Sequence, residues 1–133
     1  RGGLGSSPTI SKIPIASPKR EEAMRKFLSR KDRPRAVFCW SDLDAITLLS
    51  LAIEMGVHVP EDLAVIGYDN SPTAALGLVN LASIDQSGRE LGQVATRALI
   101  SRIEGRTASE HIFQIPSLVS RNSLTRFGNS TDR

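Results

Sequence analysis

The amino-acid sequence predicts an α/β fold with a mainly parallel sheet flanked by helices. Two short apolar runs, Ala36 to Trp40 and Leu63 to Tyr68, are rich in β-forming residues and lack apolar/polar alternation. This pattern is typical of strands that are buried on both faces of a sheet. A helix is expected between them, because Ser41 and Asp44 match the Ser-x-x-acid capping box and Gly56 is suited to end the helix. Alternating strands and helices indicate a parallel α/β sheet.

The residues before this unit are expected to add a loop, a strand and a helix. Residues 1–9 are rich in Gly and Ser and predict a flexible lead. Residues 10–15 indicate a short strand, which Pro14 would confine to a sheet edge because proline cannot donate to a ladder. A Ser-Pro pair at residues 17–18 predicts the start of a helix that ends near Arg30.

The second half of the chain is expected to continue the alternation. The predicted elements are a helix of one to two turns at residues 71–76, a strand at 81–86, a helix between Ser87 and Gly105, and short strands at 112–115 and 118–119. Ser87 and Glu90 match a second capping box. The polar tail, residues 125–133, is expected to fray.

Length and composition indicate an ordinary soluble globular protein. The chain has 133 residues, of which 40% are hydrophobic and 23% charged. Its apolar runs are far shorter than the roughly 20 residues that cross a bilayer, so no membrane partner is expected. A single cysteine, Cys39, excludes an internal disulfide and a multi-cysteine zinc site. These features favour a cytoplasmic protein.

The positive charge of the chain is local. Residues 1–35 hold ten Lys and Arg against three Asp and Glu, whereas residues 36–133 hold seven against eleven. The basic part shows neither a helix-turn-helix spacing nor an aromatic RNA-binding motif, and its cations lie on a predicted helix and the loop after it. A solvated basic face is therefore favoured over a nucleic-acid groove.

The sequence gives little support to catalysis. Ser41 lacks the Gly-x-Ser-x-Gly elbow of a nucleophile and is expected to cap a helix. Cys39 lies inside an apolar run, which favours an inert buried thiol. His58 and His111 have no ligand spacing, and no phosphate-binding glycine loop is present. We therefore expect no enzyme activity, no cofactor and no metal.

Polar residues at the ends of the two central strands are the candidates for binding. Ligands of open α/β sheets bind outside the carboxyl ends of the strands. Here those ends carry Trp40, Ser41 and Asp42 on one strand and Asp69 and Asn70 on the other. Asp69 could accept two hydrogen bonds from a small polar effector, or it could cap the helix predicted after it. Trp40 could stack on a sugar face or fill the core.

Four stretches, in order, carry a resemblance to a known family. They are AVFCWSDLDA, VPEDLAVIGYDN, LASIDQSGRELG and LVSRNS, and they extend the resemblance from about Ile10 to Ser123. Their order and spacing resemble the effector-binding core of the lactose-repressor/galactose-repressor (LacI/GalR) family of bacterial transcription regulators. The resemblance implies two similar α/β lobes of the periplasmic-binding-protein type, joined by three crossovers, with a small effector in the cleft.

The resemblance also implies which parts of these lobes are present. Residues 10–83 would form most of the second lobe, and residues 84–124 the last crossover with the closing helix and strands of an incomplete first lobe. Operator DNA would be bound only through an N-terminal headpiece outside this chain, and effector binding would control it allosterically. The runner-up hypothesis is a sugar-binding protein of a transport system, which shares the lobes and has no DNA partner.

Effector contacts follow residue by residue. Asp69 matches an aspartate that contacts effector in the family, and Gln86 matches a crossover glutamine that faces the cleft. Ser41 stands where many members carry Asn, so its reach is shorter. Trp40 stands where members often have a small residue, and Phe38 matches a position that walls the pocket or belongs to the core.

The central helix is expected to be apolar on two faces. A stripe of Ala45, Leu48, Leu49 and Ala52 accounts for the side that faces the sheet. This stripe leaves two isoleucines on another face, which either the segment after Asp69 or a second subunit would cover. The resemblance favours a homodimer, since such regulators pair through this helix and residues 74–78 across a two-fold axis. The predicted interface residues are Ile46, Ser50, Ile53, Ala74, Leu76 and Leu78.

Overall fold

The computed structural model describes residues 9–14 and 18–124, which belong to two compact units, Arg1–Arg33 and Pro34–Arg133. The first unit contains helix α1, Lys19–Leu28. It matches the predicted helix, although Ser17 lies outside the described residues. Residues 10–14 form no strand, so the strand prediction is wrong there, and Ile15 lies outside the described residues. Pro14 has no N–H for a ladder, and Ile10 is 87% exposed.

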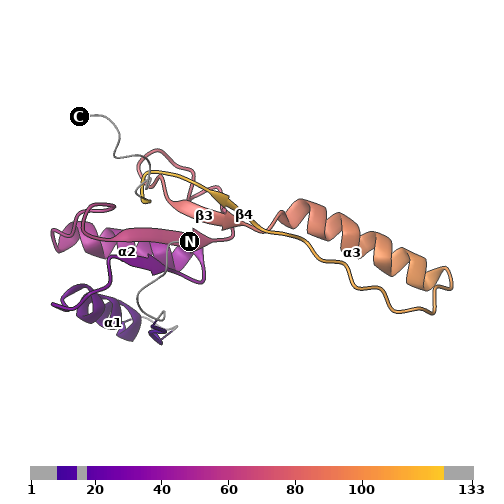
Figure 1. The fold of residues 1–133 in the computed structure, drawn as a ribbon, viewed down its shortest axis with the longest axis horizontal. Coiled ribbons are helices and arrows are strands. Elements are labelled where there is room, and N and C mark those ends of the chain that lie inside the picture. Colours follow the sequence, from indigo (N-terminus) through magenta and orange to yellow (C-terminus); the bar gives the residue numbers. More distant parts are fainter. Residues whose placement is uncertain (1–8, 15–17, 125–133) are drawn as a thin grey trace, which may run out of the picture. The chain divides into compact units, whose positions relative to one another are not determined.

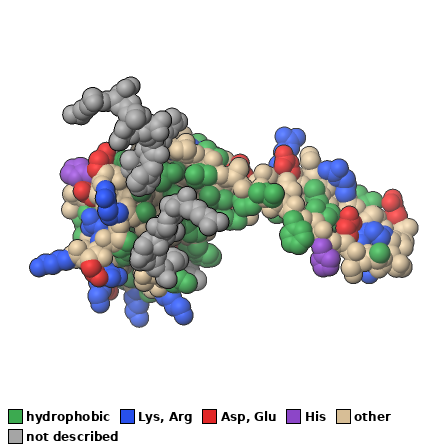
Figure 2. All heavy atoms as spheres, viewed as in Figure 1, with side chains coloured by type: hydrophobic (Ala, Val, Ile, Leu, Met, Phe, Trp, Pro, Cys, Tyr) green, Lys and Arg blue, Asp and Glu red, His purple; other side chains and the backbone are tan. Residues whose placement is uncertain are grey.

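Most of the described cations of the first unit are exposed, while Arg20 and Arg33 are half-buried. Lys and Arg side chains gather over α1 and the loop that follows it (Figure 2). Lys19, Arg25 and Lys26 are exposed, while Met24 and Phe27 on the same helix are buried. The helix is thus amphipathic, and three of its four basic residues, Lys19, Arg25 and Lys26, are solvated as the sequence predicts. Among the described residues, no helix is long and apolar enough to cross a membrane.

The second unit is built on a four-stranded sheet in the order β1-β2-β3-β4 (Figure 1). Its strands are β1 Ala36–Phe38, β2 Ala64–Tyr68, β3 Ala82–Asp85 and β4 Ser117–Val119. The first three are parallel, with Phe38 opposite Ile66 and Tyr68 opposite Ile84. Strand β4 runs antiparallel to β3. The mainly parallel sheet is therefore confirmed.

Helix α2, Asp42–Glu54, forms as its capping residues predict. The Ser41 hydroxyl accepts a hydrogen bond from the Asp44 backbone N–H at 3.2 Å. The helix ends before Gly56, which has φ +69°. Its buried residues are Asp42, Ala45, Leu48, Leu51 and Ala52, and it packs against β2. Three of the four predicted stripe residues are buried, and Leu49 is half-buried.

The core of this unit lies around β2 and the start of β3. Leu63, Val65 and Leu81 are fully buried there. Burial on both faces was predicted for β1 as well, and for β1 this is wrong: Phe38 is 58% exposed and Val37 is only half-buried. The reason is position, because β1 is the edge strand of the described sheet and has a partner on one side only.

The segment between β2 and β3 makes successive turns, so the predicted helix at residues 71–76 is wrong. The backbone bonds within residues 71–76 are of the i to i+3 kind, such as Ala74 N–H to the Ser71 carbonyl at 3.0 Å. The Ala74 carbonyl instead accepts the N–H of Leu81 at 2.9 Å. This bond turns the chain back toward β3, and the carbonyl is no longer available to a continuing helix.

Helix α3, Gly88–Ile103, is the longest helix of the described chain and has no buried residue. The second capping box is absent, because Ser87 has φ +53° and makes no side-chain cap bond. The Glu90 carboxylate instead accepts a hydrogen bond from Gln114 at 3.0 Å, which ties the returning segment to the start of the helix. That segment forms no strand at residues 112–115, contrary to the prediction, and Phe113 is 88% exposed.

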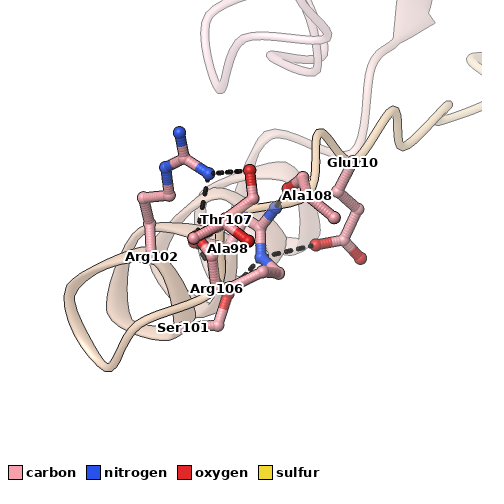
Figure 3. A network of polar contacts seen from close by, with 7 residues as sticks. All are labelled: Ala98, Ser101, Arg102, Arg106, Thr107, Ala108 and Glu110. Atoms are coloured by element: carbon pink, nitrogen blue, oxygen red, sulfur yellow. Dashed lines mark hydrogen bonds and ion pairs between the residues drawn. The ribbon is translucent and has the colours of Figure 1, made fainter.

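Arginines hold the carboxyl end of α3 (Figure 3). The Arg106 guanidinium donates to the Ser101 hydroxyl at 2.8 Å and to the Ala98 carbonyl at 3.0 Å. Arg102 donates back to the Arg106 carbonyl at 2.8 Å. Cations that bind the last carbonyls of a helix also oppose the negative end of its dipole. The turn at Gly105, with φ +111°, is thereby fixed as the end that the sequence predicts.

Candidate functional site

The polar residues that follow β1, β2 and β3 lie at one edge of the sheet. The three strands are parallel neighbours, so their carboxyl ends meet there. Trp40 and Ser41 follow β1, Asp69 and Asn70 follow β2, and Gln86 follows β3. This is the edge at which open α/β sheets bind small ligands.

Asp69 presents an exposed carboxylate at the end of β2. Its backbone has φ +106°, a conformation that L residues rarely adopt. The N–H of Asp69 donates to the Ile84 carbonyl at 3.0 Å, and its carboxylate accepts a hydrogen bond from the Gln86 side chain at 2.8 Å. No helix follows, and the Ser71 hydroxyl accepts the N–H of Ala74 at 3.3 Å. The alternative role of Asp69 as a helix cap therefore loses its basis.

The side-chain nitrogen of Trp40 is hydrogen-bonded, and the indole ring is exposed. The indole N–H donates to the Asp44 carboxylate, which also accepts the Ser41 hydroxyl at 2.9 Å. Trp40 is 69% exposed, so it does not fill the core of the described structure. Ser41 is half-buried and acts as the helix cap. An indole with a fixed edge and a free face can serve as a stacking surface.

Aromatic rings lie beside these groups on the sheet. Phe38 and Tyr68 meet edge to face, with 6.2 Å between ring centroids and an interplanar angle of 80°. Cys39, between Phe38 and Trp40, is half-buried, and burial raises the pKa of its thiol to about 12. The thiol is therefore protonated at neutral pH and is a poor nucleophile.

Asp42 was predicted to follow the first strand, but the sequence reasoning gave it no role in the site. It is only 2% exposed, although it is a carboxylate at the first position of α2. It accepts the Ser71 N–H at 2.6 Å and the Ser83 hydroxyl at 2.6 Å. A Cβ on Gly67 would lie 2.2 Å from its Oδ1. The sequence signal for this contact is Gly67, two residues before Asp69. The role of this glycine becomes clear only once β2 is seen to pack against α2.

Asn70 connects the same edge to the end of the described chain. Its amide nitrogen donates to Asp85 at 3.0 Å, and its amide oxygen accepts from Arg121 at 2.7 Å. Arg121 also donates to the Leu81 carbonyl at 2.7 Å. Asp85 accepts the backbone N–H of Ser87 at 2.7 Å, which fixes the chain as it leaves β3. Neither Asp85 nor Arg121 was among the predicted site residues.

Comparison with protein families agrees with this fold. The model of the periplasmic binding protein-like domain matches residues 4–124. The chain belongs to the periplasmic binding protein-like domain family. Its strands, its crossover helices and the edge that carries Asp69 all lie within the matched range.

Relatives within this family are transcription regulators. The chain is 38% identical over 104 residues to the HTH-type transcriptional repressor PurR of Photobacterium profundum, covering 77% of this chain and 31% of that protein. It is 40% identical over 106 residues to PurR of Mannheimia succiniciproducens, covering 79% and 32%. The chain thus spans about a third of the length of the curated relatives it matches.

Solved structures of LacI-family regulators share the fold. A LacI-family regulator from Corynebacterium glutamicum superposes with a TM-score of 0.67 at 34% identity, over 78% of this chain and 41% of that one. The regulator CelR, in complex with cellobiose, gives 0.69 at 35% identity, over 77% and 32%. A Lactobacillus casei LacI-family regulator with bound sucrose gives 0.67 at 28%, over 79% and 39%. The predicted LacI/GalR resemblance and periplasmic-binding-protein-like fold are confirmed.

Most of the predicted pairing surface is exposed. Ile53 is 77% exposed, Leu76 57% and Leu78 fully. Ile46 is half-buried and Ser50 is exposed, so this face of α2 is open to a partner. The remaining predicted residue, Ala74, is fully buried within its own unit and has no surface to offer.

The described residues contain no group of three His, Cys, Asp or Glu side chains that could hold a metal ion. His58 bonds to Asp62, with 3.1 Å between Nδ1 and Oδ2. His111 lies in the segment that returns from α3, far along the chain. The geometry at the sheet edge offers hydrogen-bond acceptors and aromatic faces, which are groups for binding.

Proposed function

We propose that this chain belongs to the effector-binding and dimerisation core of a LacI-family transcription regulator. The intact protein binds a small sugar-like metabolite in a cleft between two lobes, and this binding changes the affinity of a DNA-binding headpiece for its operator. Support comes from relatives that are named transcriptional repressors and from LacI-family structural neighbours. The alternative, a sugar-binding protein of a transport system, has less support from the same relatives.

The hydrogen-bonded pair of Asp69 and Gln86 is the observation that carries this proposal. The two side chains come from neighbouring strand ends and meet at 2.8 Å at the binding edge. The carboxylate remains exposed and retains further lone pairs, so it can accept hydrogen bonds from adjacent hydroxyls or ring N–H groups. Gln86 holds it in orientation. Asp69 therefore acts as the orienting acceptor of the effector.

The remaining predicted contacts fit around this pair. The free face of Trp40 stacks on the ring of the effector, Phe38 forms part of the wall, and Ser41 offers a short polar contact. Hydrogen bonds to a carboxylate combined with an aromatic face suit a sugar. CelR in its complex with cellobiose and the Lactobacillus casei regulator with sucrose are structural neighbours whose ligands are sugars.

We assign residues 10–83 to the second lobe and Gln86 to the last crossover. Residues 84–124 were predicted to hold the last crossover with the closing helix and strands of the first lobe. Within this range we assign residues 88–116 to the first lobe, and the pairing of β4 with β3 supports an assignment of β4 to the second-lobe sheet. Apolar side chains on this piece, such as Ile103 at 77% exposure, then face the rest of the first lobe.

The protein acts as a cytoplasmic homodimer without catalytic activity. Its pairing surface combines Ile46, Ser50 and Ile53 of α2 with Leu76 and Leu78 of the turn segment, and this surface meets its own copy across a two-fold axis. Ala74 supports the turn segment from beneath. Effector closes the lobes because it binds the closed state more tightly than the open state.

Calorimetric titration of the intact regulator tests the site. Cellobiose, sucrose and glucose are titrated, together with adenine as a flat ring that carries N–H donors. Asp69→Ala should weaken binding by about 1.5–3 kcal/mol, the range for a hydrogen bond to a charged group, or roughly ten- to 150-fold. The matched control is Glu61→Ala, which removes an exposed acid before β2. Equal affinities for wild type and Asp69→Ala would refute the proposed role.

A further inference from the structure

The buried carboxylate of Asp42 is not explained by effector contact. It is 2% exposed, and both of its oxygens are occupied by groups of the protein. Its position at the amino end of α2 places the negative charge at the positive end of the helix dipole. Two short charge-assisted hydrogen bonds supply the remaining compensation that a buried charge requires.

These bonds reach the turn that carries Asp69. Asp42 Oδ2 accepts the N–H of Ser71 directly, at 2.6 Å. Asp42 Oδ1 accepts the hydroxyl of Ser83, and that hydroxyl oxygen accepts the N–H of Asn70 at 3.0 Å. The carboxylate therefore fixes two consecutive backbone N–H groups immediately after Asp69, one directly and one through Ser83.

The turn needs such support because its backbone is strained. Asp69 has φ +106° and Asn70 has φ +48°, so two consecutive non-glycine residues lie in the left-handed region. Such conformations persist only where the surrounding structure over-determines them. Gly67 makes the arrangement possible, since a side chain there would occupy the place of the Asp42 carboxylate.

We propose that Asp42 is the positioning residue of the effector site: through Ser71 and Ser83 it holds the strained turn that aims the Asp69 carboxylate at the effector. Asp42 itself does not touch the effector. This inference rests on the proposed function of Asp69 and adds the device by which that side chain is oriented.

The first test needs no effector. Amide hydrogen exchange of the intact regulator is compared in wild type, Asp42→Asn and Ser123→Ala. Asn keeps one acceptor oxygen and places an N–H₂ group against the other donor. Exchange at Asn70 and Ser71 should accelerate about tenfold or more, as for loss of a buried charge-assisted bond, and amides inside α2 should change much less.

Ser123→Ala is the matched control, because it removes a buried hydroxyl between β2 and β3 without contact to the turn. Unchanged exchange at Asn70 and Ser71 in Asp42→Asn, or an equal acceleration at every amide, would overturn the proposal. If Asp42→Asn does not fold, Ser83→Ala takes its place. It leaves the bond to Ser71 and should accelerate exchange at Asn70 only.

The second test is a double-mutant cycle on affinity for whichever of cellobiose, sucrose, glucose or adenine the wild type binds. Asp42→Asn should weaken binding about tenfold in the wild type and have no further effect when Asp69 is already Ala, since it acts through that side chain. Additive losses would make Asp42 merely structural. A normal affinity of Asp69→Ala would instead refute the proposed function, and the exchange result would still decide the role of Asp42.

Discussion

Removal of the Ser123 hydroxyl should destabilise the sheet strongly. Ser123 is 4% exposed; its hydroxyl donates to the Val65 carbonyl at 2.7 Å and accepts the N–H of Ala82 at 2.8 Å. It joins β2 to β3 near the amino ends of these strands, whereas Asp69 follows the carboxyl end of β2. In Ser123→Ala the carbonyl and the N–H stay buried without this partner.

Each buried group left unsatisfied costs about 1–3 kcal/mol, so we expect Ser123→Ala to lose roughly 2–4 kcal/mol of unfolding free energy. With a urea m-value of about 2 kcal/mol/M, the unfolding midpoint falls by about 1–2 M. The matched control is Ser120→Ala, an exposed serine of the same segment, which should stay within about 0.5 kcal/mol. A midpoint for Ser123→Ala as close to wild type as that of Ser120→Ala would contradict the reasoning.

Three further predictions concern single residues. Gly67→Ala should lower the free energy of unfolding in urea by about 1–3 kcal/mol or more, because the new Cβ would lie 2.2 Å from Asp42. In the control Gly77→Ala the new Cβ meets no atom within 4 Å, so the free energy of unfolding should hardly change. Burial raises the pKa of the Cys39 thiol to about 12. The stability that the protonated thiol contributes is therefore complete below about pH 9 and declines as the pH rises toward 12. In urea unfolding at several pH values, Cys39→Ala should lack this part of the decline. Ile46→Asp should shift a dimer toward monomer in sedimentation, and a wild type that is monomeric at tens of micromolar would contradict the proposed pairing.

Patterns that depend on local chemistry predicted the structure well. The serine cap of α2, the glycine after it and the apolar runs of β1 and β2 all form where the sequence places them. Each of these signals is complete within a few residues. The failures have separate causes: the Ser87 N–H is bound by the Asp85 side chain, and the Ala74 carbonyl accepts Leu81. Residues 112–115 are tied to α3 by a side-chain bond from Gln114 to Glu90.

The candidate site also contains residues that could be predicted from the sequence and residues whose contacts could not. Asp69, Gln86 and Trp40 could be found because strand ends in a parallel sheet converge at one edge. The contacts of Asp42 and Arg121 could not be predicted, since their partners are 29 and 51 residues away in the sequence, at Ser71 and Asn70. In the sequence, Asp42 has only the features of an aspartate that interacts with a helix dipole. Its further role becomes visible only when the structure places Gly67 beside it.

The charges at the edge that carries Asp69 bear on the kind of effector that the proposed site would accept. Asp69 and Asp85 both present carboxylates there, and each is oriented by a hydrogen-bond donor of the protein, Gln86 and Asn70 respectively. Arg121 also reaches this edge, but its guanidinium donates to Asn70 and to the Leu81 carbonyl. A phosphate or carboxylate of an effector beside Asp69 would therefore meet like charge, which is costly in a site that excludes water. Hydroxyls and N–H groups would instead complete the unused acceptor positions. If effector binds here as proposed, a neutral effector rich in donors is favoured, and calorimetry should show a phosphorylated sugar binding less tightly than its unphosphorylated form.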